Sequence, residues 1–161
     1  EAVKEAKGIH TMEDFETTID LNMDAFIPDS YISNEYQKLD IYKRIAGIEN
    51  QQDYDDMLEE LLDRFGELPK AVMNLLTIAK IKALAHRVYV TEIKQLGRDL
   101  KITLYEKAQL NPAGMPALLQ KYRRGLQFKN EQEVKFILTP EGKVLDSLTE
   151  FLLALEKMVE E

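Results

Sequence analysis

The sequence predicts an α+β fold, in which a mostly antiparallel sheet packs with helices in the order β-ααα-ββ-α-ββ-α. Two kinds of hydrophobic spacing lead to this prediction. Near the N-terminus and in four later segments, apolar residues alternate with polar ones, as they do in half-buried strands. Elsewhere apolar residues recur every three or four positions, as in amphipathic helices. Because strands and helices are partly segregated along the chain, the pattern favours the α+β class.

The first strand is predicted to begin at Thr17, where the alternation starts. One side of this strand carries Ile19, Leu21 and Met23, and the other carries Asp20, Asn22 and Asp24. Residues 27–32 then form a turn. Pro28 ends the strand because it has no N–H group to donate to a ladder.

Three helices are predicted to follow, over residues 33–47, 51–65 and 69–88. The apolar stripe of the first helix is interpreted as Tyr36, Leu39, Tyr42, Lys43 and Ala46. The stripe of the second helix is Tyr54, Met57, Leu58, Leu61, Leu62 and Phe65. The third helix is apolar nearly all round, so we expect it to be the central core helix.

The junction between the second and third helices contains residues that commonly end one helix and begin another. Gly66 is placed for a left-handed C-cap, which a residue with a Cβ adopts only at a cost. Pro69 suits the first position of the next helix. Leu68 has no side-chain acceptor for capping, so another group must satisfy the first amides of that helix.

The rest of the chain predicts two hairpins, a short helix between them and a final helix. The first hairpin joins residues 90–96 to residues 100–106 through Gly97-Arg98-Asp99. Asn111 caps the short helix and Pro112 opens it. The second hairpin pairs residues 126–128 with residues 134–138. The last helix has its apolar stripe at Val144, Leu145, Leu148, Phe151, Leu152, Leu155 and Val159.

Length and composition limit the class of protein. At 161 residues we expect one domain over residues 17–161, with residues 1–16 as a linker. The absence of cysteine excludes disulfides and thiolate metal sites. No apolar run approaches the roughly 18 residues of a membrane span. These features together are typical of a cytoplasmic protein that does not contact a membrane.

Negative charge is concentrated on the second predicted helix. Residues 49–67 hold eight acidic residues and only one basic residue, Arg64, whereas the net charge of the whole chain is −8. Asp56, Glu60, Asp63 and Glu67 project roughly opposite the apolar stripe. A solvated helix face and a docking surface for another protein both explain such a block. The acidic balance argues against wholesale nucleic-acid binding, which normally requires a basic surface.

Motifs for catalysis or cofactor binding are absent. The only Gly-Lys pair, Gly142-Lys143, is preceded by Ile137 where a phosphate loop needs glycine and followed by Val144 where it needs a hydroxyl. His10 near Glu13 and Asp14 is a poor metal site, and His86 suits the end of a helix. The acids of residues 49–67 could act as acid–base catalysts only in a desolvated cleft. We therefore expect no enzyme activity, no catalytic residue, no metal and no cofactor in this chain.

One basic cluster offers an alternative function. Lys121, Tyr122, Arg123 and Arg124 are consecutive, and Lys129 follows. An aromatic ring among basic residues could stack on nucleic acid, which would suit a module that contacts nucleic acid or RNA polymerase. Positive charge at the end of a short helix is the simpler explanation, because the helix dipole favours it.

Three short sequence motifs, in a fixed order along the chain, resemble the motifs of one protein family. Residues 25–32, AFIPDSYI, are similar to its A-x-I-P-D-x-Y-I phrase, and residues 42–46, YKRIA, to its Y-K-R-I-A phrase. Residues 63–69, DRFGELP, match its D-R-[FY]-G-x-[LM]-P phrase. The family is the C-terminal domain of the bacterial transcription-repair coupling factors, the Mfd proteins. The resemblance is dense from residue 17 to about residue 85.

The resemblance implies a regulatory role. Whole proteins of this family are ATP- and Mg-dependent DNA translocases that bind RNA polymerase and DNA and recruit UvrA, and residues 1–8 resemble the end of their motor domain. The C-terminal domain resembles a lid that docks on an N-terminal UvrB-like module, hides its UvrA-binding surface and restrains the motor. We expect the polar contact of this lid at Glu60, Asp63 and Arg64, which share one helix edge, with Asp56 and Glu67 beside them.

Overall fold

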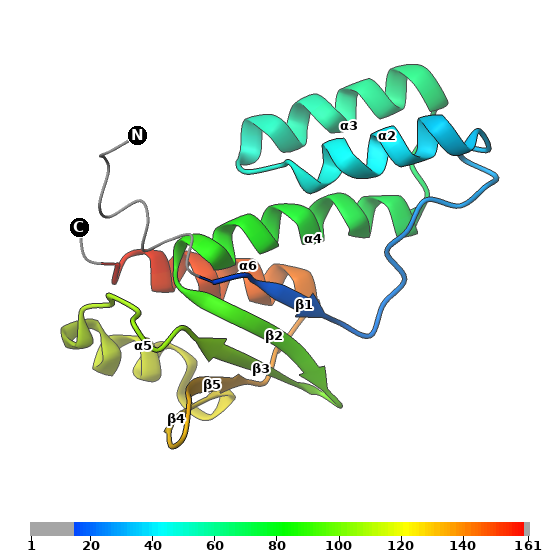
Figure 1. Ribbon diagram of the computed structural model, residues 1–161. Coiled ribbons are helices and arrows are strands. Elements are labelled where there is room, and N and C mark those ends of the chain that lie inside the picture. The colour runs from blue at the N-terminus through cyan, green and yellow to red at the C-terminus, as the bar shows by residue number, and fades with distance from the viewer. Residues whose placement is uncertain (1–14, 160–161) are drawn as a thin grey trace, which may run out of the picture. The chain divides into compact units, whose positions relative to one another are not determined.

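The computed structural model describes residues 15–159, whose secondary structure follows the predicted order of elements. The contacts within the chain gather into two compact units. We call residues 22–84 the helical unit, and residues up to 21 together with residues 85 onward the sheet unit. Figure 1 shows three helices in the first and the whole sheet in the second. The α+β class with a mostly antiparallel sheet is confirmed.

The helical unit contains α2 (Glu35–Ala46), α3 (Gln51–Phe65) and α4 (Lys70–Arg87) as far as Leu84. Two of these helices begin with an asparagine cap. The Asn34 side chain accepts a hydrogen bond from the Gln37 amide at 3.0 Å. The Asn50 side chain accepts one from the Asp53 amide at 2.8 Å, and the Asp53 carboxylate accepts one from the Glu49 amide at 3.0 Å. The side chains of Asn50 and Asp53 therefore each accept from a backbone amide and together fix the start of α3.

The core of the helical unit is built mainly from β-branched and leucine side chains. Its buried members are Ile27, Ile32, Ile41, Ile45, Ile48, Met57, Leu61, Val72 and Leu76. The predicted stripe of α3 is buried or half-buried except for Leu62, which is 47% exposed.

The predicted core stripe of α2 is wrong for most of its members. Tyr36 is 86% and Leu39 is 55% exposed, and Lys43 and Ala46 also face solvent. The buried residues of this helix are Ile41 and Ile45 instead, and Tyr42 is half-buried. The reason is that α2 carries apolar residues on two sides, so helical spacing alone cannot tell which side meets the core.

Gly66 ends α3 with a positive φ of 87°, as predicted, but its ψ is −165° rather than the value of a left-handed helical residue. This extended region with positive φ is accessible essentially only to glycine. The hydroxyl of Tyr31 donates to the Gly66 carbonyl at 2.8 Å and lies 3.1 Å from the Leu61 carbonyl, so the residue is also held by the turn before α2. Pro69 lies one residue before α4, and its carbonyl accepts from the Val72 and Met73 amides.

The sheet unit holds five strands in the order β1-β2-β3-β5-β4. β1 (Thr18–Asp20) pairs parallel to β2 (Val90–Leu96), and every other pair is antiparallel. β1 is shorter than predicted. Side-chain exposure still alternates from Glu16 to Phe26, but the ladder with β2 covers only three residues. Alternating apolar and polar residues predict which side chains are exposed, but a β-strand also requires a neighbouring strand for its backbone hydrogen bonds.

The two predicted hairpins are confirmed. β2 turns into β3 (Asp99–Leu104) at Gly97, which has a φ of 63°, and β4 (Leu126–Asn130) pairs with β5 (Val134–Leu138). Between the hairpins, Asn111 caps a 3₁₀ turn, η1 (Pro112–Gly114), that leads into α5 (Met115–Tyr122). A second 3₁₀ turn, η2 (Arg123–Gly125), leads into β4, and α6 (Val144–Glu156) follows β5.

Aromatic residues form the centre of the sheet unit. Phe136 on β5 meets Phe151 on α6 edge-to-face, with ring centroids 5.2 Å apart. Phe15, which the sequence had placed in the linker, packs in this unit. Its ring stacks on Tyr105 with centroids 4.6 Å apart and is tilted against the His86 ring with centroids 4.4 Å apart. The predicted linker residues 1–14 lie outside the described part of the chain. None of the described helices is long and apolar enough to cross a membrane.

Candidate docking surface

Glu60 lies at the centre of an ionic cluster that joins α2 to α3. Arg44 on α2 donates two hydrogen bonds to its carboxylate, one of them at 2.7 Å from Nη1 to Oε2. Arg64, one turn later on α3, donates from Nη1 to Oε2 at 2.8 Å. These hydrogen bonds, the ones from Arg44 first, lower the pKa of Glu60 to about 2. The carboxylate is therefore ionised at neutral pH and shared by two guanidinium groups.

The cluster braces the helical unit. The Glu60 side chain is 30% exposed, and the fork of Arg44 fits the carboxylate with two parallel bonds. The guanidinium of Arg64 also lies 4.9 Å from the centre of the Phe65 ring. Glu60 and Arg64 thus already have partners within the unit. Their predicted docking contact stays a prediction. It would have to form in addition to the hydrogen bonds that Glu60 already accepts from Arg44 and Arg64.

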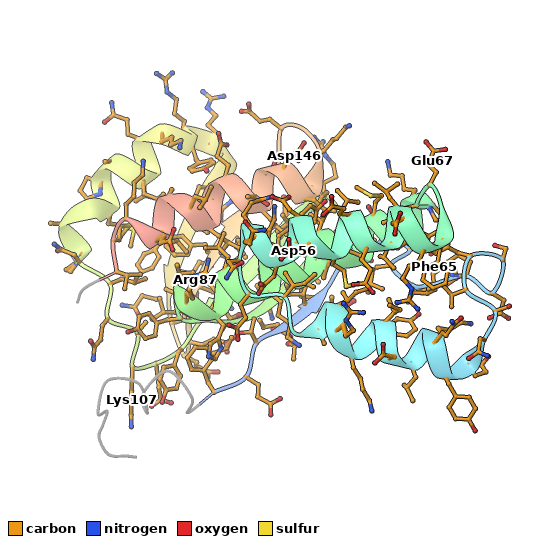
Figure 2. All side chains as sticks on the ribbon, turned by 90° about the horizontal axis from the view of Figure 1, so that it is seen from above. Asp56, Phe65, Glu67, Arg87, Lys107 and Asp146 are labelled. Carbon is orange, nitrogen blue, oxygen red and sulfur yellow. The ribbon has the colours of Figure 1, made fainter. Side chains whose placement is uncertain are left out.

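The other three predicted docking residues are exposed. Asp63 makes no ion pair or hydrogen bond through its side chain with any residue between 15 and 159. Asp56 accepts a hydrogen bond from the Gln52 amide group at 2.8 Å. Figure 2 shows Asp56 on α3 and Glu67 in the loop that follows this helix. These acids present negative charge to solvent, which long-range attraction to a basic partner requires.

A shallow depression adjoins the acidic surface. Its volume is about 310 Å³, and its lining combines Arg44 with two acids, two apolar side chains and a glycine: Asp53, Asp56, Ile48, Met57 and Gly47. It lies at the C-terminal end of α2 and the N-terminal half of α3.

Sequence reasoning missed the role of Arg44. The signal was present, since Arg44 belongs to the YKRIA phrase and the acidic block needs positive charge nearby. What the sequence could not show is that α2 and α3 lie alongside each other in the register that brings Arg44 to Glu60, 16 residues later.

The aromatic member of the alternative basic cluster, Tyr122, packs partly inside the sheet unit. The Tyr122 ring meets Phe151 edge-to-face at 5.7 Å, and its buried hydroxyl has no hydrogen-bond partner within residues 15–159. Burial, with a smaller contribution from Glu150, raises the pKa of Tyr122. The ring is therefore half-buried, with Lys121 Nζ 5.6 Å from its centre, and contact of this cluster with nucleic acid stays a prediction. The cations of this cluster, Lys121, Arg123, Arg124 and Lys129, are all exposed.

His86 is the one histidine within residues 15–159, and it has a hydrogen-bonding role. The Nδ1 atom of His86 lies 3.2 Å from the Thr17 hydroxyl, which itself donates to the Val90 carbonyl at 2.7 Å. Since that hydroxyl has one hydrogen, His86 is the donor in their contact. Residues 15–159 contain no cluster of three or more potential histidine and acidic ligands. His10, Glu13 and Asp14 lie outside the described residues.

Comparison with known proteins identifies the family. The model of the TRCF domain matches residues 21–115. The chain belongs to the TRCF domain family. The match covers both the DRFG phrase and the acidic surface of α3, and it confirms the resemblance seen in the sequence.

Curated relatives agree with this assignment. The transcription-repair-coupling factor of Bacillus subtilis (strain 168) is 33% identical over 161 residues, which is 98% of this chain and 14% of that protein. The one from Staphylococcus aureus (strain USA300) is 36% identical over 162 residues, again 98% of this chain and 14% of the relative. The chain thus spans about one seventh of the length of these relatives.

A solved structure supports the fold of the TRCF domain as well. The crystal structure of a C-terminal domain of transcription-repair coupling factor matches with a TM-score of 0.80 and 26% identity. The match covers 89% of this chain and 94% of the other. This chain therefore resembles a C-terminal domain of such a factor and not its motor.

Proposed function

We propose that this TRCF domain is a regulatory docking domain without catalytic activity of its own. It would dock on the N-terminal UvrB-like module of a longer transcription-repair coupling factor, mask the surface that binds UvrA and restrain the ATP-driven motor. The observation that carries this proposal is the exposed acidic surface of α3, with Asp56, Asp63 and Glu67 facing solvent. The longer protein would bind RNA polymerase and DNA in the cytoplasm.

The ionic cluster of Arg44, Glu60 and Arg64 holds the helix that carries the docking surface in place. Since Arg44 and Arg64 hold Glu60 between two helices, the helix edge that carries Asp63 is presented on a fixed scaffold. Exposed charge pairs are individually worth about 0–1 kcal/mol and weaken in salt. A lid held by such contacts is weak and reversible, which suits a switch between a closed and an open state.

Binding between two purified pieces tests the proposal. The chain is mixed with the separately purified N-terminal module, and the dissociation constant is measured at low salt and at about 150 mM salt. We expect binding that weakens with salt and with Asp63→Lys, because this variant reverses an exposed charge that has no partner in the unit. Glu131→Lys, a similar charge reversal in the hairpin turn of the sheet unit, serves as the control.

Two outcomes would contradict the proposal. The first is no binding to the N-terminal module at low salt. The second is equal weakening by Asp63→Lys and Glu131→Lys, which would show a general charge effect instead of a docking surface. In the full-length protein, Asp63→Lys should raise both UvrA binding and basal ATPase activity.

The alternative function, a contact with nucleic acid, is tested with the chain alone. We expect no ATP hydrolysis, because the phosphate-loop motif is absent, and no sub-micromolar DNA binding at about 150 mM salt, because the chain is acidic. Tight DNA binding in a gel-shift assay that is lost on Arg123→Glu would favour the alternative.

A further inference from the structure

Helix α2 exposes two large apolar side chains, Tyr36 and Leu39, beside Tyr42, which packs partly against the core of the helical unit. Tyr36 is 86% and Leu39 is 55% exposed, and the half-buried Tyr42 lies three residues after Leu39 on the same side. The Tyr42 hydroxyl accepts a hydrogen bond from the Ile27 amide at 2.8 Å, which fixes the position of this ring. Exposed aromatic and leucine side chains that gather on one face are typical of an interaction surface.

The charges on this face are arranged symmetrically about Leu39. Glu35 lies four residues before Leu39 and Lys43 four residues after it, so the three form one row along the helix. The two tyrosines have the same symmetry, because Tyr36 lies three residues before Leu39 and Tyr42 three residues after it. A face with this arrangement is complementary to itself when two copies of the helix run antiparallel.

We propose that this face binds a second copy of the chain through an antiparallel pairing of the two α2 helices, with the two-fold axis at Leu39. In this arrangement Leu39 packs on Leu39 of the other copy, and Tyr36 packs on its Tyr42. Glu35 forms an ion pair with Lys43 of the other copy, and the two-fold axis makes that pair twice. The proposal concerns α2 and is independent of docking through the acidic surface of α3.

The surroundings of the face fit this pairing. A shallow hollow of about 410 Å³ lies between Glu35, Tyr36, Lys38, Leu39 and Tyr42, and it would receive an apolar side chain of the other helix. Lys43 is exposed and has no ion-pair partner within residues 15–159, so it is available. The Glu35 Oε2 atom lies 4.0 Å from Lys38 Nζ, but Lys38 makes a closer ion pair with the Asp29 carboxylate. Glu35 can therefore turn to Lys43 of the second copy.

The association should be weak. α2 has 12 residues and is about 18 Å long, so the pair lies at the lower end of the interface sizes that hold proteins together. We expect a dissociation constant on the order of 100 μM, and hence a monomer when dilute and a dimer when concentrated.

A cysteine placed on the proposed axis tests the pairing directly, because the chain contains no cysteine. In Leu39→Cys, the two introduced thiols of a dimer face each other across the axis and can be oxidised to a disulfide with diamide. We expect rapid conversion to a covalent dimer of about twice the 18.6 kDa chain mass. Leu62→Cys, at a similarly exposed leucine of α3, is the matched control and should cross-link much more slowly.

Sedimentation of the unmodified chain provides the second measurement. The weight-average mass should rise toward the dimer between about 10 μM and about 1 mM, and Lys43→Glu should weaken association about tenfold by placing two like-charged pairs in contact. Combining Lys43→Glu with Glu35→Lys should restore much of the loss. A chain that stays monomeric at about 1 mM, equal cross-linking of the two cysteine variants, or no recovery in the double variant would each overturn the proposal.

Discussion

Replacement of Gly66 by alanine is expected to destabilise the helical unit through backbone strain alone. Gly66 has a φ of 87° and a ψ of −165°, and a Cβ added there would meet no atom within 4 Å. No steric contact therefore contributes to the effect. A residue with a Cβ in such a region costs on the order of 1–3 kcal/mol. Alanine recovers about 0.4–1 kcal/mol, because it reduces the freedom of the unfolded chain. We expect a net loss of about 1–2 kcal/mol.

Thermal and urea unfolding of the chain measure this loss. For a protein of this size, 1 kcal/mol shifts the Tm by about 2–4 °C, so Gly66→Ala should lower it by several degrees. The matched control is Gly47→Ala, since Gly47 also ends an exposed helix of the same unit but has an ordinary φ of −89°. Gly47→Ala should leave the Tm nearly unchanged.

A third variant distinguishes the observed backbone from an ordinary left-handed cap. Asparagine is tolerated in left-handed helical caps, but not in the extended region that Gly66 occupies. Gly66→Asn should therefore be about as destabilising as Gly66→Ala. Equal Tm values for Gly66→Ala and Gly47→Ala would refute the strain argument, and rescue by asparagine would show that Gly66 is a left-handed helical cap.

Three further changes probe the ionic cluster, a cap and the aromatic core. Glu60→Gln should remove about 1 kcal/mol of stability at neutral pH. Because the pKa of Glu60 is lowered from 4.5 to about 2 by folding, this stabilisation is full above about pH 4.5 and is lost as pH falls through 2, so the variant should flatten the acid side of a stability–pH curve. Asn50→Ala should cost about 1 kcal/mol by urea unfolding, since the Asp53 amide loses its cap. Tyr122→Phe should leave the Tm unchanged or raise it, because the buried hydroxyl has no partner in the described chain; a loss above about 1 kcal/mol would show that it does.

The bounds of α3 show how much local chemistry can predict. The helix was expected over residues 51–65 and runs over Gln51–Phe65. Its apolar stripe and its terminal glycine lie within a short stretch, so their signals reinforce one another. The hairpins were predicted for the same reason, since Gly97 marks the turn between β2 and β3.

The candidate site was predicted only in part. Sequence patterning located the exposed acids Asp56, Asp63 and Glu67 on or just after one helix. It could not show that Glu60 is shared by Arg44 and Arg64, because Arg44 comes from another helix. It also could not show that the Tyr122 ring packs edge-to-face against Phe151 of a distant helix.

The sequence by itself therefore determined the order of the elements, the bounds of α3, the positive φ at Gly66 and the acidic block, since each depends on residues close together in the chain. Only the tertiary structure decided which side of α2 is buried. Ile41 and Ile45 pack inside and leave Tyr36 and Leu39 outside. It also decided the length of β1, whose partner strand lies about 70 residues later. The spacing of residues along a helix shows which of its faces are apolar. Which of two apolar faces becomes buried depends on the free energy of packing against residues distant in the sequence.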